Sequence, residues 1–307
     1  MFAHRAKALQ SRLASSPLSY RQSLRQFSSS PVSSKLTLAY DYYEAERPSP
    51  DSATNAPIIF MHGLFGSKKN NRSMSKVFAR ELNRSVYAID LRNHGESPHD
   101  PRHDYTALAE DVEHFIQDHE IKNSALIGHS MGAKTAMVVA LRAKTPISTL
   151  ISVDNAPVDA ALKSDFAKYI RAMRAIEAAG VKKQTEADAI MATYESNLPI
   201  RQFLLTNLQR SKEDGMQRFR VPVEYLANAL DNMADFPFKD PDEARWSGPT
   251  LFVRGTQSHY VPDETLPIIG RFFPRFQVKD IDCGHWVVSE KPEEFRKAVV
   301  EFMQDAE

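Results

Sequence analysis

Short apolar runs that alternate with helical patterns are the feature of this sequence that most constrains its fold. Most of these runs have the length and composition of strands buried on both faces of a sheet. The predicted strands lie at residues 36–43, 58–61, 85–90, 124–128, 149–154, 250–254 and 276–281, and helical patterns lie at residues 73–82, 105–119, 132–142 and 295–303. Strands that alternate with helices predict an α/β fold with a doubly wound, mostly parallel sheet. In such folds the functional side chains follow the C-terminal ends of the strands.

One interval departs from this alternation. Between Asp154 and Trp246 the sequence shows no convincing strand, only helical patterns such as residues 164–179 and 222–230. We therefore predict a helical lid at residues 155–246, inserted over the sheet of a domain that spans residues 35–307. The length of 307 residues fits one large α/β domain or two small ones, and 42% hydrophobic residues can form a substantial core.

Charge and cysteine content argue against several classes of function. Lys plus Arg number 39 and Asp plus Glu number 39, so the formal net charge is zero and nothing favours a nucleic-acid partner. Cys283 is the one cysteine, which excludes an intramolecular disulfide and argues against a cysteine-based zinc site. No run approaches the 18 apolar residues of a membrane span. We expect no metal, no cofactor and no integral membrane span.

The N-terminal segment has a composition of its own. Residues 1–34 contain no Asp or Glu, several arginines and many serines. This composition is typical of organelle transit peptides, and the apolar stretch of a secretory signal is missing. Residues 25–28, Arg-Gln-Phe-Ser, resemble the processing site of mitochondrial precursors, which places the predicted cleavage between Phe27 and Lys35. We predict a mitochondrial transit peptide at residues 1–34 and a matrix location; the alternative is an unstructured tail without an address.

The sequence Gly-His-Ser-Met-Gly at residues 128–132 predicts a nucleophilic serine. It follows the apolar run that ends at Ile127 and opens the helical pattern at residues 132–142. A sharp strand-to-helix turn strains the serine backbone and brings both neighbouring positions close to other elements, so Gly128 and Gly132 fit there. The hydroxyl of Ser130 is then directed into the space above the sheet. An ordinary Gly-Ser turn is the alternative interpretation.

A serine hydroxyl is almost fully protonated at neutral pH and needs a general base. His285 is the candidate, because it follows the last predicted strand on a loop that returns to the strand ends. A single histidine usually has a surface or structural role. The position of His285 after the last strand favours a catalytic role instead. The other histidines considered belong to backbone motifs or adjoin a solvated helix: His62, His94, His129, His103, His114 and His119.

A carboxylate must hold the imidazole in one tautomer and stabilise its protonated form. After the penultimate strand, where an aspartate is common, the sequence has Ser258 instead. Asp154 ends the strand that follows the nucleophile helix, and a carboxylate there could reach the imidazole from the neighbouring strand. We predict Asp154 as the catalytic acid. The alternatives are that Asp154 only caps a turn, and that Asp263 is the acid.

Two backbone amides are expected to stabilise the developing oxyanion. One is the N–H of Met131, directly after the nucleophile, and the other is the N–H of Leu64, in the turn at residues 62–66 after the first buried strand. The segment at residues 90–97 is predicted to be a structural turn that supports this loop. An orientation of Arg92 towards the active site is the alternative.

Three motifs resemble one subgroup of a known superfamily. They are His-Gly-Leu-Phe-Gly-Ser at 62–67 followed by Asn70 and Asn71, Gly-His-Ser-Met-Gly-Ala-Lys at 128–134, and Val-Asp-Asn-Ala-Pro at 153–157. The chain after residue 34 resembles the α/β-hydrolase superfamily, in particular mitochondrial abhydrolase-domain proteins, small bacterial esterases and yeast ethanol acetyltransferases. The resemblance implies Ser130 as nucleophile, His285 as base and an acid after the sixth strand, in agreement with Asp154. Departures are small: Asn93, where many relatives have Gly, and Asn155 after the acid.

These residues and the resemblance together predict a serine hydrolase that acts on short- to medium-chain carboxylic esters or thioesters. Water as the second nucleophile gives hydrolysis, and an alcohol gives acyl transfer, as in the ethanol acetyltransferases. The alternative is a non-catalytic α/β-hydrolase-like binding protein of mitochondria, and a lyase or C–C hydrolase is a weaker one. Dehalogenation is disfavoured, because on this fold it uses an Asp nucleophile and not a serine. Some apolar residues of the lid are candidates for an acyl pocket or for the core: Leu162, Phe166, Ile170, Phe203, Leu204 and Leu226.

Overall fold

The computed structural model describes residues 35–46, 56–159 and 164–306, which belong to one unit, Lys35–Glu307. The predicted transit peptide and Leu162 lie outside the described residues. Among the described residues, no helix combines the length and the apolar character that crossing a bilayer requires.

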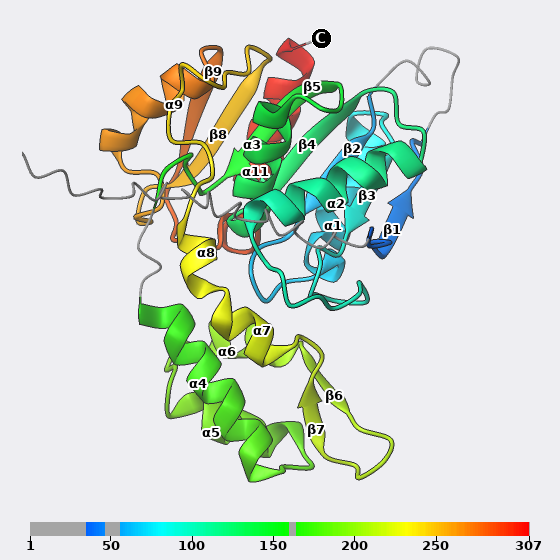
Figure 1. Cartoon of the computed structure of the whole chain (residues 1–307), viewed down its shortest axis with the longest axis vertical. Helices are drawn as coiled ribbons and strands as arrows, with labels where there is room; N and C mark the ends of the chain where they lie inside the picture. The colour runs from blue at the N-terminus through cyan, green and yellow to red at the C-terminus, as the bar shows by residue number, and fades with distance from the viewer. Residues whose placement is uncertain (1–34, 47–55, 160–163, 307) are drawn as a thin grey trace, which may run out of the picture. The chain divides into compact units, whose positions relative to one another are not determined.

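Seven strands form one sheet in the order β1-β3-β2-β4-β5-β8-β9 (Figure 1). Only the edge strand β1 runs antiparallel to its neighbour, so the sheet of the described residues is otherwise parallel. The strands are β1 (Tyr40–Tyr43), β2 (Ile58–Met61), β3 (Val86–Ile89), β4 (Ser124–His129), β5 (Ile147–Val153), β8 (Thr250–Gly255) and β9 (Phe276–Ile281). The predicted doubly wound, mostly parallel sheet is confirmed.

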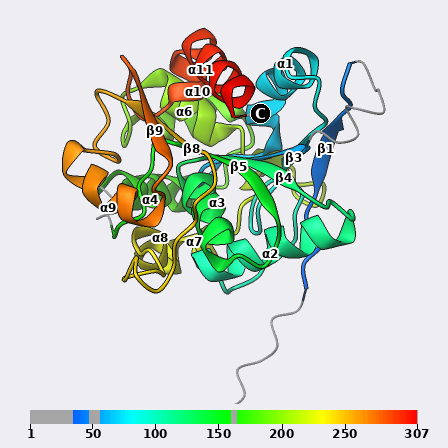
Figure 2. The ribbon, with the colours of Figure 1, turned by 90° about the horizontal axis from the view of Figure 1, so that it is seen from above.

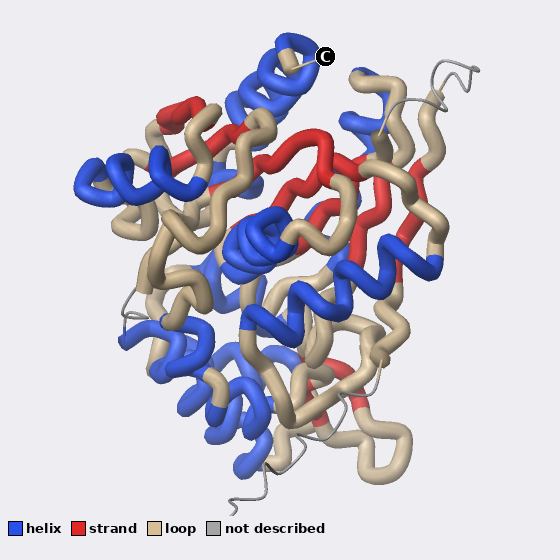
Figure 3. The backbone as a smooth tube through the Cα atoms, turned by 45° about the horizontal axis from the view of Figure 1, so that its top comes forward, coloured by secondary structure: helices blue, strands red, loops and turns tan. Residues whose placement is uncertain are grey.

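Helices cover both faces of this sheet (Figures 2 and 3). The helices α1 (Arg72–Glu81) and α11 (Pro292–Asp305) pack on one face, where Phe78 and Phe295 contact Phe60 of β2. Other helices cover the opposite face: α2 (Tyr105–Asp118), α3 (Met131–Arg142) and α9 (Leu266–Phe272). Short helices complete the connections: η1 (Lys68–Asn71), η2 (Asp263–Thr265) and α10 (Val287–Glu290). Alternate residues of the central strands enter the two cores, as expected for strands buried on both sides.

The chain between β5 and β8 forms a helical cap, which we define as residues 164–234. Figure 1 shows most of its elements gathered on one side of the sheet, with α8 nearest to it. The cap consists of α4 (Ser164–Ala179), α5 (Gln184–Ala192), α6 (Leu198–Leu205), α7 (Val223–Asn228), α8 (Leu230–Ala234) and a two-stranded antiparallel sheet of β6 (Leu208–Arg210) and β7 (Gln217–Phe219). The prediction that this interval holds no strand was wrong. Strands of three residues are too short to show a period of two, so only the tertiary fold reveals them.

Candidate active site

Ser130 lies at the turn between β4 and α3, as its motif predicted. Its φ of 53° and ψ of −111° are strained for a residue with a side chain. The neighbouring glycines are required by space, because a Cβ on Gly128 would lie 2.1 Å from the carbonyl oxygen of Gly132. A Cβ on Gly132 would lie 2.7 Å from the carbonyl oxygens of Met61 and His62. The two glycines therefore let β4 and α3 meet in a turn that projects Ser130 from the sheet.

Asp154 follows β5 and is fully buried, and both oxygens of its carboxylate accept hydrogen bonds. Oδ1 accepts a hydrogen bond of 3.1 Å from the Gly255 amide, and Oδ2 accepts one of 2.5 Å from the Ser258 hydroxyl. The backbone amide of Ser130 donates to the carbonyl oxygen of Val153 at 2.9 Å, which ties the serine turn to the end of β5. Adjacent strand ends thus bring the serine and the carboxylate to the same edge of the sheet.

His285 connects the two. Its Nδ1 lies 2.6 Å from Oδ2 of Asp154, and its Nε2 lies 3.0 Å from Oγ of Ser130. Because a carboxylate can only accept, Nδ1 carries the proton and Nε2 accepts from the serine hydroxyl. The ring stacks on Tyr260 with 4.1 Å between centroids, and the carbonyl oxygen of His285 accepts a 2.8 Å hydrogen bond from Nε2 of His129. The imidazole is therefore held by its ring face, both nitrogens and its backbone.

The alternative acid does not join this arrangement. Asp263 begins η2, its side chain is 77% exposed, and it forms an ion pair of 2.6 Å with Arg254. Ser258 is the residue whose role sequence analysis missed, since it was noted only for occupying the place of a common aspartate. The structure shows that its hydroxyl shares Oδ2 of Asp154 with His285. Its position after the penultimate strand was the available signal. A side chain at that position reaches the same point above the sheet that an aspartate there would reach.

The loop that carries Leu64 is fixed by neighbouring side chains. Phe65 adopts a positive φ of 62°, and its amide donates to Nε2 of His94 at 3.1 Å. Its carbonyl oxygen accepts a 2.7 Å hydrogen bond from the side-chain amide of Asn207, which belongs to the cap. On the other side of Ser130, Met131 is the first residue of α3, so its amide has no acceptor within the helix. Leu64, Ser130 and Met131 line one small cavity.

The segment at residues 90–97 supports this loop, as predicted. The Asp90 carboxylate accepts a hydrogen bond of 2.6 Å from the Lys68 amide and pairs with the Lys68 ammonium at 2.6 Å. His94 donates through Nδ1 to the carbonyl oxygen of Arg92 and keeps Nε2 as an acceptor, so it is neutral. Burial and the neighbouring His62 hold the pKa of His94 well below its usual value.

The alternative orientation of Arg92, towards the active site, was wrong. The side chain is buried and binds Asp111 of α2 through two hydrogen bonds of 2.5 and 2.8 Å. It also donates to the carbonyl oxygen of Arg102. A guanidinium with this many buried acceptors is a structural link between the segment 90–97 and α2.

Two cavities adjoin the serine and the histidine. The cavity at Ser130 has a volume of about 10 Å³ and includes Phe166 of the cap. The cavity at the His285 side has a volume of about 160 Å³ and is lined by a mixture of aromatic and polar groups. Of the other apolar cap residues proposed from sequence, Phe203 lines a further cavity beside His129. The remaining described ones are buried in the hydrophobic core: Ile170, Leu204 and Leu226.

Comparison with known proteins agrees with this architecture. A family model described as "alpha/beta hydrolase fold" matches residues 56–292. A probable alcohol acetyltransferase of Saccharomyces cerevisiae is 42% identical over 287 residues, which cover 88% of this chain and 84% of that protein. The sn-1-specific diacylglycerol lipase ABHD11 of Mus musculus is 36% identical over 273 residues, covering 87% of this chain and 85% of the lipase. A solved marine microorganism esterase has a TM-score of 0.79 and 31% identity, covering 87% of this chain and 100% of the esterase. The chain therefore belongs to the α/β-hydrolase fold family, as its motifs predicted.

Proposed function

We propose that this protein is a serine hydrolase or acyltransferase that acts on carboxylic esters or thioesters through an acyl-enzyme. The observation that carries the proposal is the continuous chain of hydrogen bonds from the Ser130 hydroxyl through His285 to the buried carboxylate of Asp154. This arrangement supplies a nucleophile, a base in a defined tautomer and a group that stabilises the protonated base.

In the first half of the proposed reaction, Oγ of Ser130 attacks the carbonyl carbon of the substrate and transfers its proton to Nε2 of His285. The carbonyl oxygen becomes an oxyanion, and the amides of Leu64 and Met131 are the donors that stabilise it. The intermediate then expels the alcohol or thiol, which takes the proton from His285. The products of this half are the acyl-enzyme and the free leaving group.

In the second half, water or an alcohol attacks the acyl-enzyme and transfers its proton to His285, which returns it to Ser130. The leaving group must receive its proton from His285, so we assign the cavity of about 160 Å³ beside this histidine to the leaving or accepting alcohol. Its lining includes Asp165, Gln257 and His259, which suit a polar group. Similarity both to an acetyltransferase and to a lipase supports keeping hydrolysis and acyl transfer in one proposal.

A fluorophosphonate probe and p-nitrophenyl acetate hydrolysis together test the proposed nucleophile. We expect wild-type protein to be labelled and to hydrolyse the ester, and the Ser130→Ala variant to lose labelling and at least about 10⁴-fold of kcat. Ser73→Ala, which removes an exposed hydroxyl from α1, is the matched control and should retain both. An unlabelled, inactive but folded wild-type chain would contradict the proposal and favour the non-catalytic binding protein.

The second nucleophile is tested by adding ethanol to the same assay. Ethyl acetate formed from p-nitrophenyl acetate, in proportion to ethanol and dependent on Ser130, would show acyl transfer. If only acetate appears while ethanol remains in large excess, the enzyme is a hydrolase alone. The burst of p-nitrophenol in the first turnover measures the acyl-enzyme, because both routes share that intermediate.

We further propose that the protein works in the mitochondrial matrix. The support is the acid-free, arginine- and serine-rich composition of residues 1–34. A fluorescent protein fused after residue 35 should enter mitochondria, and the same fusion with its arginines changed to glutamine should not. Even distribution of both fusions through the cell would contradict this location.

A further inference from the structure

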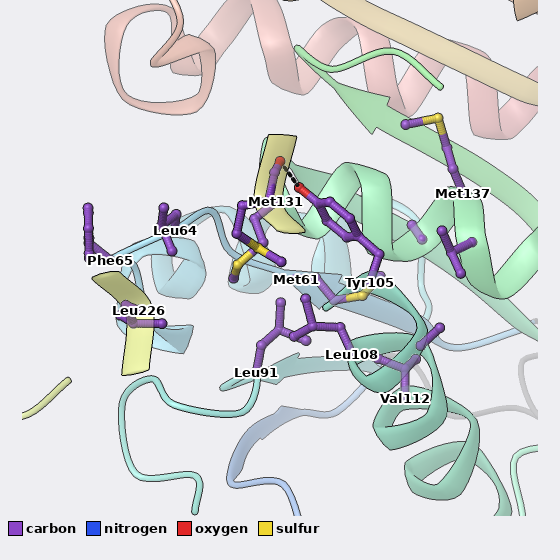
Figure 4. Close-up of a cluster of buried hydrophobic side chains, with 14 of the residues drawn as sticks. Met61, Leu64, Phe65, Leu91, Tyr105, Leu108, Val112, Met131, Met137 and Leu226 are labelled. Atoms are coloured by element: carbon purple, nitrogen blue, oxygen red, sulfur yellow. Dashed lines mark hydrogen bonds between the residues drawn. The ribbon is translucent and has the colours of Figure 1, made fainter. Parts of the chain in front are cut away.

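Three consecutive backbone carbonyls at the C-terminal end of α8 are bound by side chains of the hydrolase core. The hydroxyl of Tyr105 donates to the carbonyl oxygen of Met233 at 3.1 Å, the dashed contact in Figure 4. The ammonium of Lys134 donates to the carbonyl oxygens of Ala234 and Asp235 at 3.1 and 3.0 Å. The last carbonyls of a helix have no acceptor role within it, so these bonds satisfy groups that would otherwise be unpaired.

Lys134 has the environment of a structural anchor. It lies on the buried side of α3, one helical turn beyond Ser130, and only 1% of its surface is exposed. Its ammonium also lies 5.3 Å from the centroid of the Tyr105 ring, so the two carbonyls and the ring face account for its charge and its protons. Burial lowers the pKa of Lys134 to about 8, against the effect of Asp159 and Asp235, so the side chain is mostly protonated at neutral pH.

The anchored end of α8 forms a wall of the cavity at the nucleophile. Tyr105, Lys134 and Met233 line this cavity together with Ser130 and Met131. Figure 4 shows Tyr105 close to Met131. The volume of about 10 Å³ holds roughly one water-sized group. The leaving group occupies the His285 side in the proposed mechanism, so the acyl group extends into this smaller cavity.

We propose that the end of α8, held by Lys134 and Tyr105, is the end wall of the acyl pocket and limits good substrates to an acyl group of about two carbons. This inference rests on the proposed function and names the substrate class of the same site. Lys134 and Tyr105 are positioning residues that act through Met233, whose side chain contacts the acyl group. Loosening the wall should therefore change the preferred chain length more than the chemistry.

The test measures kcat/KM for p-nitrophenyl acetate, butyrate and hexanoate with each variant. Wild type should prefer acetate, since each methylene that a pocket rejects is worth about tenfold or more. Met233→Ala should raise the butyrate-to-acetate ratio at least about tenfold. Lys134→Met keeps the unbranched stem of the side chain but removes the ammonium and its hydrogen bonds, and Tyr105→Phe removes one hydroxyl. We expect the butyrate-to-acetate ratio to rise about fivefold in Lys134→Met and about twofold in Tyr105→Phe.

The ratio is the decisive readout, because the fraction of active protein cancels between two substrates of one preparation. Lys144→Met changes an exposed lysine just beyond the same helix and should leave the ratio unchanged. If Lys134→Met does not fold, Met233→Ala and Tyr105→Phe still test the wall. Unchanged ratios in those two variants, or a wild-type preference for hexanoate, would overturn the inference while ester turnover upholds the proposed function. A wild type that neither turns over esters nor reacts with fluorophosphonate would overturn both.

Discussion

The two halves of the candidate active site are held in place by different means. Ser130, Asp154 and His285 each follow a strand of one sheet, β4, β5 and β9, so backbone hydrogen bonds between strands fix their separation. The cap meets the same site through side-chain hydrogen bonds to backbone carbonyls, such as those at Phe65 and Met233. In the proposed reaction, the chemistry thus depends on the register of the sheet, whereas the inferred range of substrates depends on a few side chains.

The largest expected effect concerns Asp154, the proposed acid on the sheet side. In Asp154→Asn the amide cannot hold His285 with Nδ1 protonated, so Nε2 no longer accepts the serine proton. We expect kcat for p-nitrophenyl acetate to fall about 10⁴-fold while fluorescence and thermal unfolding show a folded protein.

Asp263→Asn is the matched control for this prediction. Its carboxylate is exposed and paired with Arg254, so the change should alter kcat by less than about twofold. A large loss in Asp263→Asn together with a small loss in Asp154→Asn would reverse the assignment of the acid. It would also contradict the view that the chemistry depends on the register of the sheet.

The sequence predicted this half well for a physical reason. Gly128 and Gly132 have no room for a side chain, and a buried strand must precede them, so the motif and its context define one local geometry. The choice of Asp154 over Asp263 needed the resemblance as well as the pattern, because loop lengths do not reveal which carboxylate reaches an imidazole. The function of Ser258 was missed, since a single serine hydroxyl has no pattern that separates it from a turn residue.

A second prediction concerns the loss of folding stability at low pH, which we expect to come from histidines of the sheet half. Burial lowers the pKa of His103 to about 3, and burial and the neighbouring His285 lower that of His129 to about 4. In the unfolded chain both imidazoles have a pKa of about 6.5. The stability that they contribute is therefore present above that pH and is lost as pH falls towards the pKa values of the folded protein. The free energy of unfolding should drop by about 4 kcal/mol between pH 8 and pH 5 from these two alone.

Urea unfolding at both pH values measures this loss. Residues 155–246 contain no histidine, so the imidazole contribution belongs to the sheet half. His103→Gln should reduce the difference between the two pH values by about 2 kcal/mol, whatever it does to stability at pH 8. Equal stability of wild type at pH 8 and pH 5 would show that these histidines are protonated in the folded protein.

The cap shows where sequence analysis reached its limit. The helix α4 lies at the predicted residues 164–179, because one apolar stripe is enough to identify an amphipathic helix. Sequence analysis did not predict the hairpin of β6 and β7. It also did not predict the hydrogen bonds of Lys134 and Tyr105 to the end of α8. Lys134 in particular looks like a solvated residue of an N-terminal helical turn, and only the fold shows that α8 covers it.

Ser258→Ala tests how far the fixed geometry of the sheet half depends on a loop. The hydroxyl donates to Oδ2 of Asp154, and a hydrogen bond to a charged group contributes about 1.5 kcal/mol or more, so kcat/KM should fall about tenfold.

Ser289→Ala is the control: its hydroxyl donates to the carbonyl oxygen of Trp286, away from Asp154, so kcat/KM should stay unchanged. A loss of activity in Ser258→Ala that thermal unfolding traces to a loss of folded protein would assign Ser258 to loop stability rather than to the position of Asp154.

The smallest expected effect lies at the hydrogen bond from Asn207 of the cap to the loop that carries Leu64. Asn207→Ala leaves the carbonyl oxygen of Phe65 without its 2.7 Å donor, so the loop that carries Leu64 gains freedom. We expect kcat for p-nitrophenyl acetate to fall about fivefold and the free energy of unfolding by about 1–2 kcal/mol. Asn228→Ala, at an exposed position of α7, should change neither. If Asn207→Ala altered only the chain-length ratio and not kcat for acetate, the cap would act on substrate range alone, and the two halves would be more independent than this contact implies.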